Sequence, residues 1–79
     1  MSSSDPRTDT VTEVEGLAQL LHETSGRHGA FEAVAPAHDW WDWYAAYITA
    51  RKAGSAPDAA SATAGRYMAD VKHVVVPSG

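Results

Sequence analysis

The sequence predicts an all-α fold, a small three-helix domain, and three observations support this prediction. Large side chains recur at steps of three and four residues in three separate segments, which is the period of an amphipathic helix. Strict alternation of apolar and polar residues, which would indicate strands, is absent. Residues typical of helix starts and ends flank the segments. We therefore expect helices at about residues 12–25, 39–53 and 56–72.

The connections between these helices predict the domain organisation. Only a few residues separate the second helix from the third, which favours an antiparallel helical hairpin. An irregular loop is expected before the second helix. Residues 1–10 are small and polar and contain a proline, so we expect a disordered tail there. The single helical domain is then residues 11–76, and residues 77–79 form a second tail.

The first helix is predicted from a start signal, an apolar stripe and a stop signal. Thr12 and Glu15 have the spacing of a capping box, and Gly26 can end the helix. The apolar residues between these signals recur at helical spacing and indicate a helix that packs against others. They are Val14, Leu17, Leu20 and Leu21, with Val11 at the edge.

The second helix carries all three tryptophans and two of the three tyrosines within residues 38–48. Trp40, Tyr44 and Tyr47 lie at helical spacing on one side, and Trp43 and Tyr47 form a second pair four residues apart. Asp39 can cap the start, and Gly54 can end the helix in a left-handed turn. So wide an aromatic face requires cover from another helix, a second chain or a ligand.

The third helix begins at a strong start signal, with Ser55 as the expected cap, Pro57 in the first turn and Asp58 after it. Its first half is mostly alanine and serine. We expect Ala60 and Ala64 to lie opposite the tryptophans, because bulky rings need a shallow facing surface. The three valines at 74–76 favour an extended segment that packs on its own domain or adds to another chain.

Composition excludes several classes of function. The chain of 79 residues has no cysteine, which leaves no thiolate metal site or disulfide. Its net charge of −4 and pI of about 5.3 disfavour nucleic acid and anionic membrane surfaces. No run of residues is long and apolar enough to span a membrane, and the N-terminus lacks a signal peptide's apolar region. A cytoplasmic protein is the resulting expectation.

The aromatic face is the candidate binding site. One interpretation is packing in the core, or an interface for self-association or a protein partner, where aromatic residues are enriched. The other is a pocket for a flat or cationic small molecule, because aromatic faces attract cations and nearby acids reinforce that attraction. The candidate residues are Phe31, Trp40, Trp41, Asp42, Trp43, Tyr44 and Tyr47.

A metal site is a weaker alternative. His28 and Glu32 are four residues apart, and His38 follows before the second helix, so their side chains could converge on a divalent metal. Local capping at the start of the second helix is the preferred explanation of His38 and Asp39. No serine lies in a strand-to-helix turn, and no glycine-rich phosphate loop is present. We therefore predict a non-catalytic protein without a cofactor.

Residues 38–47 (HDWWDWYAAY), with RHG at 27–29 and RYM at 66–68, resemble a family of short bacterial proteins labelled bleomycin resistance or glyoxalase-like proteins. The similarity extends over residues 17–76. The label implies the vicinal oxygen chelate fold, a repeated βαβββ module, in which some members hold a metal and others sequester a cationic drug between two subunits. This chain is shorter and its periodicity predicts helices, so the all-α prediction is kept and no metal ligand is transferred. The resemblance adds sequestration of a bleomycin-like drug, or a metal-dependent glyoxalase-like activity, as alternatives to a binding module.

Overall fold

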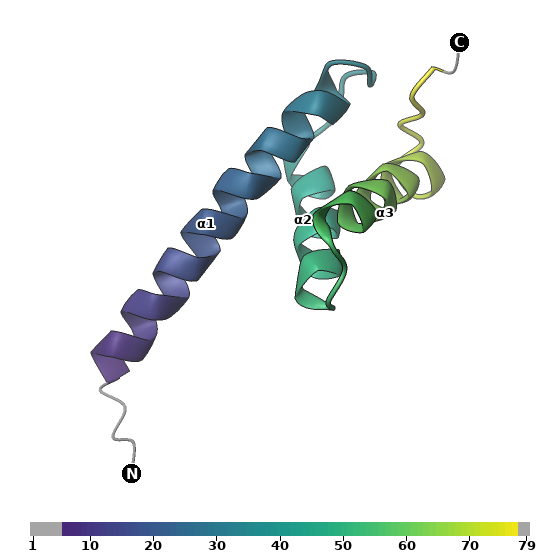
Figure 1. The fold of residues 1–79 in the computed structure, drawn as a ribbon. Coiled ribbons are helices and arrows are strands. Elements are labelled where there is room, and N and C mark those ends of the chain that lie inside the picture. Colours follow the sequence, from purple (N-terminus) through teal and green to yellow (C-terminus); the bar gives the residue numbers. More distant parts are fainter. Residues whose placement is uncertain (1–5, 78–79) are drawn as a thin grey trace.

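The chain folds into three helices (Figure 1), and the computed structural model describes residues 6–77. The helices are α1 (Pro6–Glu32), α2 (Trp40–Lys52) and α3 (Pro57–Asp70). Within the described range there is no strand, so the all-α prediction is confirmed and the βαβββ module is not formed there. No helix in the same range is both long and apolar enough to cross a membrane.

Helix α1 is longer than predicted at both ends. It begins at Pro6, a residue type favoured in the first helical turn because its fixed φ suits a helix. The predicted capping box at Thr12 is therefore wrong, and residues 6–10 are helical rather than a disordered tail. Residues 1–5 of that predicted tail lie outside the described range.

The predicted stop at Gly26 is also wrong, because α1 continues to Glu32. Each glycine inside a helix costs only about 1 kcal/mol relative to alanine. The extra turns bury His28 and half-bury Phe31 against the other helices, which outweighs that cost. The irregular loop predicted before the second helix is confined to residues 33–39.

Helix α2 ends at Lys52, and Gly54 forms the left-handed turn that follows it, as predicted. Gly54 has φ of 107°, a backbone conformation that L side chains rarely adopt. The Gly54 N–H donates to the carbonyl of Arg51, and the Ser55 N–H donates to that of Ala50, each at 3.0 Å. This pair of bonds is the Schellman motif, which satisfies carbonyls at the end of a helix. At the other end, Asp39 occupies the cap position, but its side chain makes no capping hydrogen bond.

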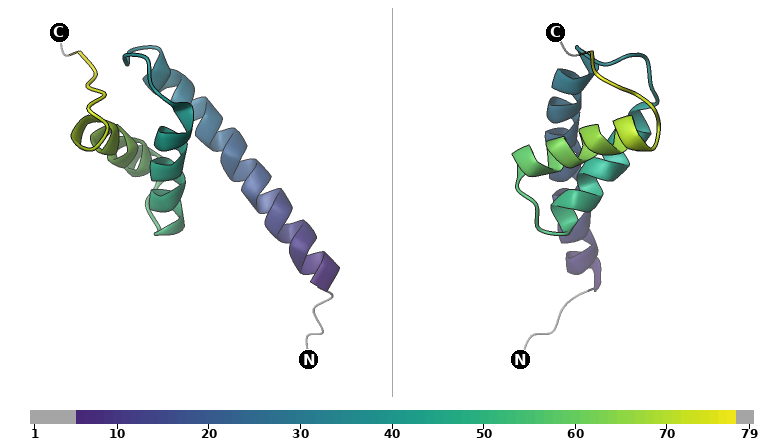
Figure 2. Two further views of the ribbon diagram at one scale, coloured as in Figure 1. Left: turned by 180° about the vertical axis from the view of Figure 1, so that it is seen from behind. Right: turned by 90° about the vertical axis from the view of Figure 1, so that its right-hand side faces the viewer.

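Helix α3 starts one residue later than predicted, with Ala56 at the cap position and Pro57 as the first helical residue. Ser55 therefore does not cap α3; its carbonyl accepts a hydrogen bond from Arg51 at 3.0 Å. The predicted antiparallel hairpin is not confirmed, because α3 crosses α2 obliquely (Figure 2). We use the term α2–α3 pair for these two helices.

The core lies between α2 and α3 and is closed by the C-terminal half of α1. The buried rings of Trp43 and Tyr47 are stacked, with centroids 5.2 Å apart. Ala60 and Ala64 of α3 are fully buried in the same cluster, which confirms the prediction of small residues opposite large rings. The core is completed by Met68 of α3, by Thr24 and His28 of α1, and by Val74 in the segment after α3.

The N-terminal half of α1 extends beyond the rest of the molecule (Figures 1 and 2). A helix of 27 residues is about 40 Å long, whereas 13 or 14 residues span about 20 Å. The α2–α3 pair therefore covers only half of α1. All residues from 10 to 19 are exposed.

Candidate functional site

The aromatic helix has an internal side and an external side. Trp43 is 1% exposed, whereas Trp40 and Trp41 are each 53% exposed. This division follows from roughly 3.6 residues per turn, which places Trp43, Tyr47 and Ala50 on the face toward α3 and the other two indoles away from it. Among the described residues, the indole nitrogen of Trp43 has no hydrogen-bond partner, so packing alone holds this ring. Trp43 and Tyr47 therefore belong to the core rather than to a binding site.

The external aromatic side chains form a contiguous group at the start of α2. The ring of Trp40 lies edge-to-face with Tyr44 at 4.9 Å and with Trp41 at 5.5 Å. Tyr44 is half-buried and joins this group to the core. Phe31 is half-buried and packs near Trp43, so it closes the end of the core. Of the predicted binding residues, Trp40, Trp41 and Tyr44 remain available to a partner.

Asp42, the acidic candidate, has a different role. Its carboxylate lies 3.6 Å from the ammonium group of Lys72, which follows α3. The side chain is only 22% exposed. This contact joins the start of α2 to the segment after α3, close to the point where the Val74 N–H donates to the carbonyl of Met68 at 2.8 Å. The valine segment thus packs on its own domain through Val74, while Val75 and Val76 are exposed.

His28 and His38 are brought together, as the metal hypothesis requires. Their Nε2 atoms are 2.9 Å apart, and Nδ1 of His38 lies 2.7 Å from the carbonyl oxygen of Pro36. A carbonyl only accepts, so Nδ1 of His38 carries a hydrogen. In the neutral pair, Nε2–H of His28 therefore donates to Nε2 of His38. Burial lowers the pKa of His28, the nearby Glu32 carboxylate opposes that shift, and His38 adds to it.

This histidine pair has a structural role, because it links two segments of the fold. It joins the C-terminal part of α1 to the loop before α2, and the rings of Phe31, Trp43 and Tyr44 surround His28. No group of three or more His, Cys, Asp or Glu side chains within the described residues is arranged to hold a metal ion. The bond from His38 to the carbonyl of Pro36 is a local backbone contact but not a helix cap, so the predicted capping role of His38 is not confirmed.

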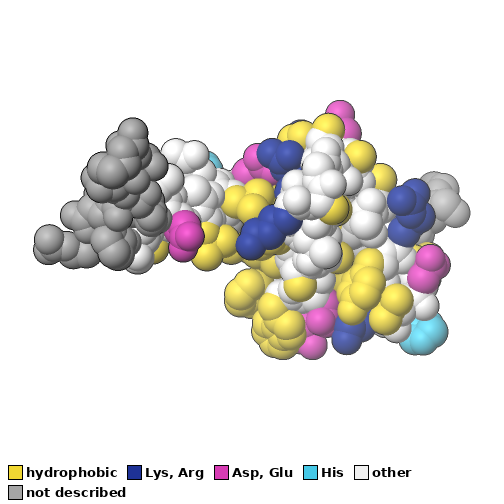
Figure 3. Space-filling view, turned by 90° about the horizontal axis from the view of Figure 1, so that it is seen from below, with side chains coloured by type: hydrophobic (Ala, Val, Ile, Leu, Met, Phe, Trp, Pro, Cys, Tyr) yellow, Lys and Arg dark blue, Asp and Glu magenta, His cyan; other side chains and the backbone are white. Residues whose placement is uncertain are grey.

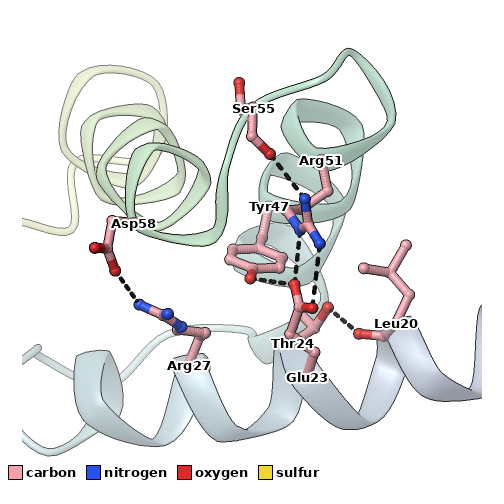
Figure 4. A network of polar contacts seen from close by, with 8 residues as sticks. All are labelled: Leu20, Glu23, Thr24, Arg27, Tyr47, Arg51, Ser55 and Asp58. Atoms are coloured by element: carbon pink, nitrogen blue, oxygen red, sulfur yellow. Dashed lines mark hydrogen bonds and ion pairs between the residues drawn. The ribbon is translucent and has the colours of Figure 1, made fainter.

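A polar network that the sequence pattern did not reveal joins α1 to α2 (Figure 4). Glu23 accepts hydrogen bonds from the Tyr47 hydroxyl at 2.5 Å and from Nε of Arg51 at 2.7 Å. The hydrogen bond from Arg51, followed by that from Tyr47, lowers the pKa of Glu23. Burial, and then the bond to Glu23, raises the pKa of Tyr47. In the sequence, the one sign of this network was Arg51, because a cation on the aromatic face of α2 requires an acidic partner.

A second ion pair joins α1 to the start of α3. Nη1 of Arg27 lies 2.6 Å from the carboxylate of Asp58 (Figure 4). The Asp58 side chain is 92% exposed, so solvent screens this pair and its contribution to stability is small. Both contacts fix α1 through its C-terminal half only.

A groove runs between α1 and the start of α2, and we call it the α1–α2 groove. Small residues of α1, Ser25 and Gly29, lie along it, with aromatic residues of α2 opposite them. Its lining residues are Leu21, Ser25, His28, Gly29, Glu32, Trp40 and Tyr44. Leu21, which is 41% exposed, lies at the end of the groove nearest the N-terminus of α1.

The exposed half of α1 carries an apolar stripe, which we call the α1 stripe. It consists of Val11, Val14, Leu17 and Leu21, which are 41–60% exposed. Hydrophobic side chains gather along α1 and continue onto the body of the molecule (Figure 3). Leu21 belongs to both the α1 stripe and the α1–α2 groove, and Trp40 belongs to both the groove and the external aromatic group, so these three surfaces adjoin one another.

Comparisons of this chain with protein-family models, with curated proteins and with solved structures found no match. The assignment of the candidate site therefore rests on the positions and exposure of its residues alone. The resemblance to proteins labelled bleomycin resistance remains a prediction.

Proposed function

We propose that this chain is a small non-catalytic binding module that presents its external aromatic surface to a hydrophobic protein partner. The observation that carries the proposal is the 53% exposure of both Trp40 and Trp41, next to the exposed α1 stripe. Large apolar surfaces of this kind mark interaction sites in soluble proteins. Tryptophan is also the residue type that most often dominates binding energy at protein interfaces.

The test compares the full chain with the double variant Trp40→Ser/Trp41→Ser as immobilised baits. Proteins retained from a cell extract are identified by mass spectrometry, and the strongest candidate is purified and reconstituted with each bait. We expect the double variant to lose the partner and to keep its helical circular dichroism, because neither indole is in the core. Val75→Ser, an exposed substitution elsewhere, is the matched control. Equal binding by all three baits contradicts the proposal.

A second candidate function is sequestration of a cationic aromatic small molecule, as the resemblance to bleomycin resistance proteins implies. Its support is the α1–α2 groove, which is lined by the Glu32 carboxylate on the α1 side and by the rings of Trp40 and Tyr44 on the α2 side. An aromatic face beside a carboxylate suits a flat cation.

Titration with bleomycin separates this candidate from the first. Sequestration predicts quenching of tryptophan fluorescence at a saturable drug concentration, and weaker quenching in Glu32→Gln, which keeps the size of the side chain and removes its charge. A flat titration of the wild-type chain rejects this second function and leaves the protein-binding proposal unaffected.

A further inference from the structure

We infer that His28 and His38 form a pH-sensitive switch, which holds the loop at residues 33–39 against α1 at neutral pH and releases it in mild acid. This loop joins α1 to α2 (Figure 1), so its release changes where the external tryptophans lie relative to α1. The inference rests on the proposed function, because it assigns a regulation to the same binding surface. Its basis is the number of hydrogens that the two rings can hold.

The contact between the two imidazoles has room for one hydrogen. Their Nε2 atoms are 2.9 Å apart, the length of a single hydrogen bond, and Nδ1 of His38 donates to the carbonyl of Pro36. The neutral pair holds two hydrogens, one on each ring. A first added proton enters at Nδ1 of His28 and leaves the bond between the rings unchanged. A second proton has only Nε2 of His38 left, where it faces the hydrogen on Nε2 of His28.

Uptake of the second proton therefore breaks the bond. It would place two hydrogens between atoms that are 2.9 Å apart and put like charges on adjacent rings. When the loop moves away from α1, both imidazoles can be fully protonated. The open state thus binds one proton more than the closed state, so acid favours opening. Burial, which lowers the pKa of His28, adds to this effect by opposing a charge on that ring in the closed state.

The groups that face His28 do not remove this effect. The Glu32 carboxylate favours the charged form of His28, and it does so in both states because the two residues belong to the same helix. The ring of Tyr44, which packs against His28 from α2 at 5.3 Å, is a phenol and is neutral where histidines titrate. Neither group relieves the crowding of two hydrogens between the imidazoles.

The charged groups that face His38 come from α2 and from the segment after α3. His38 lines a cavity together with Asp39, Asp42 and Lys72. Asp42 and Lys72 lie 3.6 Å apart and offset each other. Asp39 can stabilise a positive charge on His38, but it is the adjacent residue and accompanies His38 when the loop opens. These groups therefore do not hold the loop closed in acid.

Release of the loop reaches the binding surface through the start of α2. His28 lines the α1–α2 groove, and its neighbour Tyr44 lies 4.9 Å from Trp40. Trp40 is the first residue of α2 and follows His38 by two positions. Once His38 is free, the start of α2 can move away from α1, and the two walls of the groove separate. A partner that contacts both the groove and the external tryptophans at neutral pH is therefore released in acid.

Hydrogen exchange of the full chain at about pH 7.5 and about pH 5.5 tests the opening, because these values lie on either side of the ordinary histidine pKa. The amides of Ala33, Val34 and Ala35 report on the loop. Their N–H groups donate to the carbonyls of Gly29 and Phe31. After correction for the intrinsic pH dependence of exchange, their protection should fall by about tenfold, the effect of one extra proton over one pH unit.

The helical circular dichroism should stay unchanged between the two pH values, because the opening is confined to the loop. Loop amides that are equally protected at both pH values overturn the switch. A loss of protection that coincides with a loss of helix overturns it as well, since that result describes unfolding of the whole domain.

His38→Gln tests whether the histidine pair causes the opening. The glutamine oxygen can accept the hydrogen on Nε2 of His28 and takes up no proton in this pH range. Protection of the loop in this variant should change by less than about twofold between the two pH values. His28→Gln removes the other titrating ring and should give the same result. His22→Gln, at an exposed position on α1, is the matched control and should open as the wild type does. Full opening of both His38→Gln and His28→Gln overturns the switch.

Repeating the bait experiment in acid separates this inference from the proposed function. A partner bound at neutral pH should leave the wild-type bait in acid and stay on the His38→Gln bait. If the loop opens but no protein distinguishes the wild type from Trp40→Ser/Trp41→Ser, the proposed function fails and the switch remains. If the double variant loses a partner but the loop stays closed in acid, the switch fails and the proposed function remains. A partner held equally at both pH values by a chain whose loop has opened overturns the control of binding.

Discussion

Tyr47 combines apolar burial with a polar contact in a single residue. Its ring is stacked on Trp43 inside the core, while its hydroxyl reaches Glu23 at the edge of that core. Arg51 binds the same carboxylate from the other side. Because Glu23 belongs to α1, these contacts fix the position of α1 on α2.

We expect Tyr47→Phe to destabilise the fold by about 1–2 kcal/mol, because it removes a buried hydroxyl that donates to a carboxylate. Urea denaturation followed by circular dichroism measures this change. Tyr67→Phe is the matched control, since Tyr67 lies on the exposed side of α3, and it should change stability by less than about 0.5 kcal/mol. Equal effects of the two substitutions would show that the bond to Glu23 contributes nothing.

His28 predicts how stability depends on pH. Burial lowers its pKa from the ordinary value of 6.5, so below that pH the unfolded chain binds a proton more readily than the folded chain does. The folded state should therefore lose stability as the pH falls from about 7 to about 5. Above pH 7 this contribution is constant, because both states are deprotonated.

Denaturation at a series of pH values provides the measurement, with His28→Gln as the comparison. The variant should lack most of the slope between pH 7 and pH 5. Glu23 acts in a separate window, since its lowered pKa means that its stabilising effect is lost only as pH falls below about 4.5. A wild-type curve that is flat from pH 7 to pH 5 would exclude the role of His28.

At the scale of elements, the α2–α3 connection depends on the backbone of Gly54. We expect Gly54→Ala to destabilise the protein by about 1–2 kcal/mol, because alanine at φ of 107° is strained. Gly26→Ala is the control of opposite sign. Gly26 is helical and a side chain there meets nothing, so alanine should stabilise by about 0.5–1 kcal/mol. Thermal denaturation of both variants gives the comparison, and two shifts of the same sign would contradict the assignment.

Sequence signals within a few residues correctly predicted the features that depend on neighbouring residues. The end of α2 at Gly54 is such a case, since one glycine determines it. The spacing of Trp43 and Tyr47, with alanines at 60 and 64, likewise predicted which residue types meet in the core. Which of the three indoles would be buried depended on where α3 crosses α2, and no local pattern carries that information.

The boundaries of α1 show where local signals fail. Gly26 carries a modest local cost, but the burial of His28 and Phe31 against distant residues decides that the helix continues. At the other end, Pro6 was a start signal in the sequence, and the polar composition around it favoured a tail instead. The binding of Glu23 to Arg51, 28 residues apart, is equally non-local.

At the scale of the whole molecule, the two halves of α1 differ in the contacts that hold them. In dilute solution, amide hydrogens of residues 10–19 should exchange faster than those of residues 24–32, because fewer contacts oppose local opening. Hydrogen exchange with mass spectrometry measures this gradient. Uniform protection of α1 in dilute wild type would contradict the prediction.

The projecting half of α1 also determines how the molecule moves through water. With principal extents of 57 × 19 × 18 Å, a single copy experiences more frictional drag than a sphere of its mass. Sedimentation velocity should therefore give this chain a frictional ratio above that of a sphere.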